Sequence, residues 1–233
     1  MNIIVLGGCG YIGSVLVNKL LKQKHKILVI DTQWFGNYLK PHKKLRIIKS
    51  DIRNLDKISF KGYETIIHLA NIANDPSSEL NPNLSWEVNV LATHEIITKA
   101  IREGIKKFIY SSSGSVYGIK KEKKVTENLA PFPLSIYNKT KMIAERVLLS
   151  FSDKIKIYII RPGTVCGVSS RMRLDISINM LTMQAIKDGA ITIFGGTQKR
   201  PNIHIEDLTN IFIFFTKKNK QPGIYNAGFE NLS

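Results

Sequence analysis

The chain has 233 residues, of which 43% are hydrophobic and 22% charged, a size and balance typical of one globular unit with a modest extra lobe. No apolar run approaches the roughly 18 residues that a membrane-spanning helix needs, and no signal peptide is apparent, so we expect a cytoplasmic protein with no membrane partner. The formal net charge of +16 comes with lysines scattered in short groups and with no nucleic-acid-binding motif. We interpret this charge as a solvated basic surface and expect no nucleic-acid partner.

The chain contains two cysteines, Cys9 and Cys166. Their positions form no pattern typical of a disulfide framework, and no cysteine and histidine cluster resembles a zinc site. We therefore expect no bound metal, and we interpret Cys9 as a small residue that fills the loop described next.

The N-terminus is expected to form a strand, a glycine turn and a helix. Residues 2–6 are apolar and mostly β-branched, Gly7, Gly10 and Gly13 follow at three-residue spacing, and residues 11–21 have helical periodicity. In a dinucleotide-binding unit these glycines allow a tight turn, a close approach of the backbone to a pyrophosphate, and packing of the helix on the strand. A purely structural glycine turn is the alternative.

A second expected strand, residues 26–30, ends at Asp31. This acid follows the glycine loop by about twenty residues, the position at which a carboxylate binds the adenosine ribose. A carboxylate repels a 2′-phosphate, so Asp31 favours NAD over NADP. A helix or turn cap is the alternative role.

Strands and helices then alternate along the chain. We predict strands at 44–49, 65–69, 107–111 and 155–161, helices at 86–102 and 135–151, and a polar loop at 70–82. Beyond Pro162 we predict helices at 175–187 and 205–216 and short strands at 192–194 and 223–226. The alternation predicts a Rossmann-type, doubly wound parallel α/β sheet over residues 1–165, with a small, partial substrate-binding lobe over residues 166–233.

Tyr137 and Lys141 are four residues apart at the start of a predicted helix, so they lie on one face. A free phenol has a pKa of about 10, and a nearby ammonium group favours its ionised form. Tyr137 could then exchange a proton with a hydroxyl group while a hydride moves to or from a cofactor. Ser113 follows the strand at 107–111 and could bridge Tyr137 and a substrate oxygen. Surface packing of a chance pair is the alternative.

A set of motifs resembles the extended short-chain dehydrogenases/reductases, specifically the NAD-dependent nucleotide-sugar epimerase/dehydratase family. The motifs are GGCGYIG at 7–13, Asp31, DIR at 51–53, HLAN at 68–71, SSSGSVYG at 111–118, YNKTK at 137–141 and RPG at 161–163. The resemblance extends over essentially the whole chain and implies NAD as cofactor, a nucleotide-sugar as substrate and a homodimer.

The resemblance also implies roles for individual residues. Together with the positions at strand ends, it predicts cofactor contacts from Gly7, Gly10, Tyr11, Ile12, Gly13, Asp31, Asp51, Ile52, Leu69, Ala70, Asn71, Asn89, Ser111, Tyr137, Lys141 and Pro162. It assigns catalysis to Ser113, Tyr137 and Lys141. It assigns substrate binding to Ser113, Asn179 and Arg200.

The reaction type follows from what comes after Ser113. Family members that dehydrate or decarboxylate usually have an acidic residue there, whereas this chain has Gly114 and Ser115. We therefore expect a 4-epimerase, in which a hydride leaves the sugar and returns to its other face. A reductase or dehydratase of the same family, or a non-catalytic NAD-binding protein, is the alternative.

Overall fold

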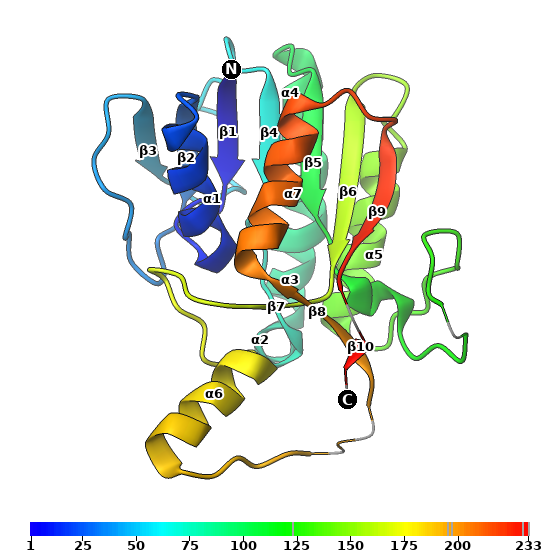
Figure 1. Ribbon diagram of the computed structural model, residues 1–233. Coiled ribbons are helices and arrows are strands. Elements are labelled where there is room, and N and C mark those ends of the chain that lie inside the picture. Colours follow the sequence, from blue (N-terminus) through cyan, green and yellow to red (C-terminus); the bar gives the residue numbers. More distant parts are fainter. Residues whose placement is uncertain (123, 195, 197, 230, 233) are drawn as a thin grey trace.

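A computed structural model describes residues 1–122, 124–194, 196, 198–229 and 231–232 (Figure 1). Its centre is a seven-stranded parallel sheet in the order β3-β2-β1-β4-β5-β6-β9. The strands are β1 (Asn2–Leu6), β2 (Lys26–Asp31), β3 (Leu45–Lys49), β4 (Thr65–His68), β5 (Lys107–Ser111), β6 (Lys156–Pro162) and β9 (Gly223–Ala227). The order reverses direction between β1 and β4, which confirms the predicted doubly wound sheet.

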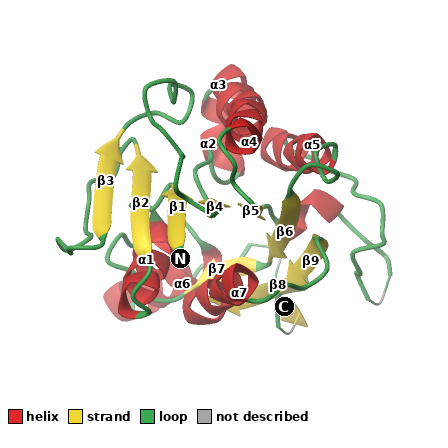
Figure 2. Ribbon diagram, turned by 90° about the horizontal axis from the view of Figure 1, so that it is seen from above, coloured by secondary structure: helices red, strands yellow, loops and turns green. Residues whose placement is uncertain are grey.

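Helices cover both faces of this sheet, as Figure 2 shows. α1 (Tyr11–Lys22) and α7 (Ile205–Lys217) pack on one face, and α4 (Ala92–Arg102) and α5 (Ile136–Leu149) pack on the other. Neighbouring residues of β1 divide between the two cores: Ile3 and Val5 join one, and Ile4 and Leu6 join the other. Since side chains alternate along a strand, a strand buried on both faces is apolar throughout.

The segment before α4 differs from its prediction in two places. The predicted loop at 70–82 contains a helix, α2 (Asp75–Leu80), because Pro76 lies in the first turn, where its missing N–H removes no helical bond. The Asn74 side chain caps this helix by accepting from the N–H of Ser77 at 2.9 Å. The predicted helix at 86–102 is present, but it begins with α3 (Pro82–Trp86) and a π-helical turn at Glu87–Leu91 before α4.

The last third of the chain does not form a separate lobe as a whole, because α7 and β9 complete the central layers. β7 (Thr164–Cys166), β8 (Arg200–His204) and β10 (Asn231–Leu232) form a second small sheet, and α6 (Ser177–Asp188) projects from the body (Figure 1). The strand predicted at 192–194 is wrong: these residues pair with no strand of the described chain, and Phe194 is 88% exposed. No helix in the described ranges has the length and apolar character needed to cross a membrane.

Candidate active site

The carboxyl ends of β1 to β4 surround a cavity at one edge of the sheet. Its lining consists of Gly7, Gly10, Asp31, Thr32, Trp34, Phe35, Asp51, Ile52, Leu69, Ala70, Asn71, Ile72 and Val88. Parallel sheets bind ligands at this edge, where the strand order reverses. Most of the cofactor contacts predicted along β1 to β4 therefore lie together, and the sequence reasoning did not identify Thr32, Trp34, Phe35, Ile72 or Val88 as part of the same lining.

The glycine loop brings α1 against the end of β1. Gly7 has a φ of +80°, and a Cβ added there would lie 2.6 Å from the backbone nitrogen of Ala70. A Cβ on Gly13 would lie 2.4 Å from the carbonyl oxygen of Gly7. The helix can therefore pack only if both positions lack a side chain. Its first residues, Tyr11 and Ile12, have backbone N–H groups that a helix leaves without internal partners, and such groups bind phosphate oxygens.

Asp31 is fixed in the cavity by two backbone groups. The N–H of Cys9 donates to Oδ2 at 2.9 Å, and the N–H of Gln33 donates to Oδ1 at 2.7 Å. Each carboxylate oxygen keeps a free lone-pair direction, so both can still accept from a ribose diol. The Cys9 thiol is buried, and burial raises its pKa to about 12, so the thiol is protonated at neutral pH.

Replacing Asp31 by Asn is expected to lower NAD affinity by about 10- to 100-fold, because charge-assisted hydrogen bonds to the ribose are lost. The preference for NAD over NADP should also become smaller, since the charge that repels the 2′-phosphate of NADP is removed. Calorimetric titration with both cofactors measures the two effects, and Asp56→Asn, a change at an exposed acid outside the cavity, is the control. Unchanged NAD affinity would contradict the role of Asp31.

These features fit NAD. The cavity has helix N–H groups for the pyrophosphate, a carboxylate for the adenosine ribose, and the side chain of Asn71 at its wall. The Asn71 Nδ2 is buried and has no hydrogen-bond partner in the described part of the chain. Because a buried donor without a partner costs free energy, this atom is suited to a ligand that enters the cavity.

The predicted catalytic residues lie at the start of α5 and at the end of β5. Ser135 caps α5 by accepting from the N–H of Asn138 at 3.2 Å, which places Tyr137 in the first turn and Lys141 one turn later. The Lys141 Nζ lies 5.9 Å from the centre of the Tyr137 ring. Ser113 caps a short 3₁₀ helix (Gly114–Tyr117), and its hydroxyl acts on the Tyr137 phenol in the direction that lowers the pKa of Tyr137.

Burial controls the protonation of this pair. Desolvation raises the pKa of Tyr137 to about 12, although the Ser113 hydroxyl and the positive charge of Arg173 act against it. The negative charge of Asp75 acts in the same direction as burial. Lys141 is 2% exposed, and desolvation lowers its pKa to about 7. Without a ligand the phenol is therefore neutral at physiological pH, and it needs additional positive charge to act as a base.

A serine and asparagine network supports Ser113. The Ser113 and Ser115 hydroxyls are 2.7 Å apart, and the Ser115 hydroxyl donates to Asn138 Oδ1 at 2.5 Å. Residues 111–118 contain no carboxylate, so hydroxyl and amide groups alone form the polar side chains of this network.

Asn89 lies outside the cavity lining, so its contact with the cofactor stays a prediction. Its side chain is fully buried away from the cavity, with Oδ1 accepting from the N–H of Ile72 at 2.8 Å. Its Nδ2 donates to the Ile72 carbonyl at 3.1 Å and to the Thr140 hydroxyl at 3.0 Å. Asn89 thus ties the loop after β4 to α5, and it positions the cavity wall relative to Tyr137.

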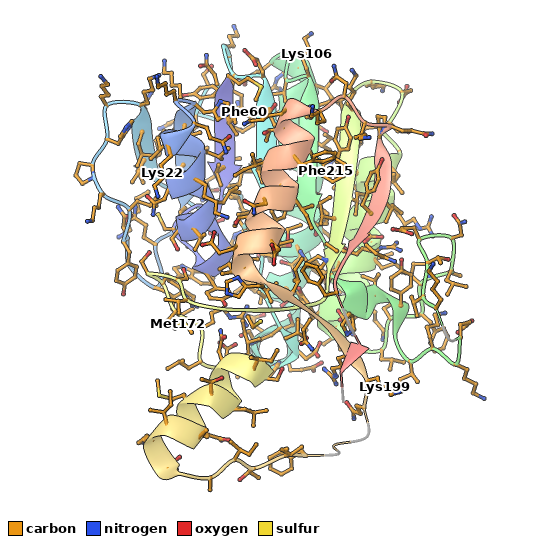
Figure 3. All side chains as sticks on the ribbon, in the orientation of Figure 1. Lys22, Phe60, Lys106, Met172, Lys199 and Phe215 are labelled. Carbon is orange, nitrogen blue, oxygen red and sulfur yellow. The ribbon has the colours of Figure 1, made fainter. Side chains whose placement is uncertain are left out.

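Asn179 also has a different environment from the one predicted for a diphosphate ligand. Its Oδ1 accepts from the N–H of Gly167 at 3.0 Å, and its Nδ2 donates to the Tyr11 hydroxyl at 3.1 Å and to the Arg173 carbonyl at 2.9 Å. Because its polar atoms are bonded within the protein, Asn179 holds the segment after β7 against α1. That segment includes Met172, which Figure 3 labels at the carboxyl end of the sheet.

The other predicted positions are structurally separate from the cavity lining. Arg200 is exposed on β8, where its Nη2 donates to Gln198 at 2.9 Å, so its binding to substrate stays a prediction. Ser111 contributes its carbonyl oxygen to Lys141 at 2.6 Å. Pro162 ends β6 beside the Ser113 turn, since a Cβ on Gly114 would lie 3.2 Å from its carbonyl oxygen.

The sequence reasoning did not identify Asp75 and Arg173, the two charged residues that act on Tyr137. Each is held by polar neighbours: Ser135 donates to Asp75 at 2.5 Å, and Arg173 pairs with Asp175 at 2.5 Å. Neither lies at the end of a strand of the central sheet, so their sequence positions gave no signal that they approach the phenol.

Comparisons with known proteins agree with this geometry. The profile of the NAD-dependent epimerase/dehydratase family matches residues 3–228. A UDP-glucose 4-epimerase of Lactobacillus helveticus is 28% identical, and the match covers 98% of this chain and 76% of that protein. An uncharacterised UDP-glucose epimerase of Bacillus subtilis is 34% identical, with 89% and 70% covered. The solved structure of UDP-glucuronic acid 4-epimerase from Bacillus cereus, in complex with UDP-glucuronic acid and NAD, is 29% identical, with a TM-score of 0.87 and coverages of 99% and 78%. The chain belongs to the NAD-dependent epimerase/dehydratase family.

Proposed function

We propose that this protein is an NAD-dependent 4-epimerase of a nucleotide-sugar, with a UDP-hexose as the first substrate to test. The observation that carries the proposal is the pairing of Tyr137 with Lys141 beside the cofactor cavity, next to a Ser113 turn without a carboxylate. The 4-epimerases among the relatives and solved structures support the same reaction.

In this proposal Tyr137 removes the proton from the sugar 4-hydroxyl, and Ser113 holds the same oxygen by a hydrogen bond. When bound, NAD supplies the acceptor for the hydride and a positive charge beside the phenol. The Lys141 ammonium adds to that charge, which favours the phenolate form of Tyr137. The keto-sugar then turns over in the site, the hydride returns to the other face of its carbonyl carbon, and Tyr137 returns the proton to the oxygen, so the inversion consumes no cofactor.

Product analysis tests the reaction class. The NAD-loaded protein is incubated with UDP-glucose and UDP-galactose, and each sugar is expected to appear from the other with no change in mass and no net NADH. Stoichiometric oxidation of added NADH would favour a reductase, and a product lighter by one water would favour a dehydratase. Firmly bound NAD without conversion of a wider panel would favour a non-catalytic NAD-binding protein.

A homodimer formed through residues 86–102 and 135–151 also belongs to this proposal. Leu91 and Trp86, which are 60% and 37% exposed, support an apolar contact on this side of the molecule. Sedimentation of the purified protein measures the oligomeric state. The cytoplasmic location stays a prediction.

A further inference from the structure

We propose that Tyr110 is a positioning residue for Lys141, and that its hydroxyl links the ammonium group to Asn71 in the cofactor cavity. This inference rests on the proposed function, because it concerns the base of that reaction. Tyr110 is the fourth residue of β5 and is completely buried. It belongs to neither the lining of the cavity nor the helix that carries Tyr137.

The Lys141 ammonium group has few hydrogen-bond partners in the protein. An ammonium group has three N–H donors and no acceptor. One donates to the Ser111 carbonyl at 2.6 Å, and a second donates to the Tyr110 hydroxyl at 3.2 Å. These are the two acceptors that the described chain provides, so a single N–H remains for the cofactor and for the side of Tyr137. Tyr110 thereby limits the ammonium group to one orientation.

The two hydrogen bonds of the Tyr110 hydroxyl fix the direction of its proton. Its lone pair accepts from Lys141, and its O–H donates to Asn71 Oδ1 at 3.4 Å, a long bond. The Asn71 Oδ1 is therefore turned toward Tyr110, and the Nδ2 that has no partner in the described residues is on the other branch of the same amide. A ligand that accepts from Nδ2 would fix this orientation, so cofactor binding and Lys141 are linked through Tyr110.

Titratable side chains from three elements face Lys141. Glu145 and Tyr137 face it from α5, Tyr110 faces it from β5, and His68 faces it from β4. His68 is uncharged, because burial lowers its pKa to about 3. Besides the distant carboxylate of Glu145, the Tyr110 lone pair is thus one of few groups that stabilise the charged form of Lys141. Without it, the pKa of Lys141 should fall and less ammonium would remain to stabilise the Tyr137 phenolate.

Tyr110→Phe removes this hydroxyl alone. The Lys141 Nζ lies 4.6 Å from the centre of the Tyr110 ring, and a phenylalanine keeps that contact. Tyr158→Phe is the matched control: Tyr158 is also completely buried, lies opposite Ile109 on the neighbouring strand β6, and donates to the Lys220 carbonyl at 2.8 Å. Tyr110→Phe loses the bonds to Lys141 and Asn71, and Tyr158→Phe loses the bond to Lys220, so only the first variant changes a group that contacts Lys141.

The main readout is the ultraviolet titration of the Tyr137 phenolate in the NAD-loaded protein, obtained as the difference between each protein and its Tyr137→Phe counterpart. NAD is present because the free phenol, with a pKa of about 12, ionises at a pH at which Lys141, with a pKa of about 7, is already neutral. Tyr110→Phe is expected to raise the midpoint by about one pH unit, since a hydrogen bond to a charged group contributes about that much. It should lower kcat at neutral pH by up to roughly tenfold with little change in KM, and the acid limb of the kcat profile should move upward. Tyr158→Phe should leave all of these unchanged.

Asn71→Ala extends the test to the cavity. It should raise the midpoint less than Tyr110→Phe does, and the double variant should shift no further than Tyr110→Phe alone, because the two residues act in series. An unmoved midpoint in Tyr110→Phe, or equal shifts in Tyr110→Phe and Tyr158→Phe, would overturn the proposal. The titration needs no sugar, so it decides on Tyr110 even if no epimerisation is found.

Discussion

Tyr137→Phe is expected to retain NAD and to lower kcat by about 10²- to 10⁴-fold, the usual contribution of a positioned general base. The substitution removes the hydroxyl that exchanges the proton and leaves the ring, the helix cap at Ser135 and the glycine loop in place. Binding of NAD should therefore be unaffected, because the cavity is lined by residues of other elements. Turnover measured with the preferred nucleotide-sugar and NAD released from the denatured protein give the two quantities.

Tyr225→Phe is the control for this experiment. Tyr225 lies on β9 and its hydroxyl donates to the Gln221 carbonyl, so this substitution removes a tyrosine hydroxyl outside the cavity. Its turnover should equal that of the parent. A Tyr137→Phe protein with parental turnover would show that another group transfers the proton.

Arg161→Met is expected to reduce the free energy of unfolding by about 3–5 kcal/mol, because it leaves the buried Glu145 carboxylate without its partner. The two side chains are 2% and 1% exposed. They meet through two bonds, Nε to Oε1 at 2.9 Å and Nη2 to Oε2 at 2.5 Å. The Ser112 hydroxyl also donates to Glu145, so the pair lies directly beneath the Ser113 turn.

Two further variants interpret this result. Arg161→Met combined with Glu145→Leu should recover most of the lost stability, since neither position then leaves an unpaired buried charge. Arg53→Met removes an exposed guanidinium that pairs with Asp51 and Glu87, and it should cost less than about 1 kcal/mol. Unfolding in denaturant measures the free energy of unfolding of each of these variants. A single Arg161→Met variant as stable as Arg53→Met would mean that the Glu145 carboxylate is solvated or protonated in the native protein.

The central sheet could be predicted from the sequence because its strands are short, apolar and β-branched. β1 and β5 have the predicted bounds. The other predicted strands of this sheet differ from the observed ones by one residue, at one end or, for β6, at both ends. Burial on both faces makes such a strand uniformly apolar, and that pattern survives in a single sequence. The glycine loop was equally readable, since close backbone contacts at Gly7 and Gly13 exclude every side chain.

The edge of the fold was harder to predict, because local signals there compete with tertiary contacts. β8 contains Pro201, a residue that argues against a strand, yet β8 lies in a small sheet that tolerates it. Pro76 lies in the polar loop predicted at 70–82 and instead occupies the first turn of α2. At residues 192–194 the apolar pattern of a strand is present, but no described strand lies beside it.

The candidate site could be predicted as a location and only partly as a set of contacts. Strand ends indicate which residues face the cavity, so Asp31 and Asn71 were found. The partners of an amide side chain depend on distant elements, so the sequence did not reveal that Asn89 bonds to Ile72 and Thr140 or that Asn179 bonds to Tyr11. Tyr110 lies in the strand predicted at 107–111, and the sequence assigned no role to its hydroxyl, which became relevant only beside Lys141.

The π turn at Glu87–Leu91 has a consequence for how the chain tolerates change in length. Such a turn contains one residue more than an α-helical turn, and each residue of an α-helix advances the side chains by about 100°. Deleting a single residue here would give a regular α-helix whose two ends stay nearly in phase, because the wide turn holds the extra residue, but the residues inside the turn would point in new directions. Asn89 would then point away from Ile72, and the strand end that it anchors would lose its attachment to the helix behind Tyr137. A shortening that improves the helix locally would thus uncouple the two halves of the reaction centre.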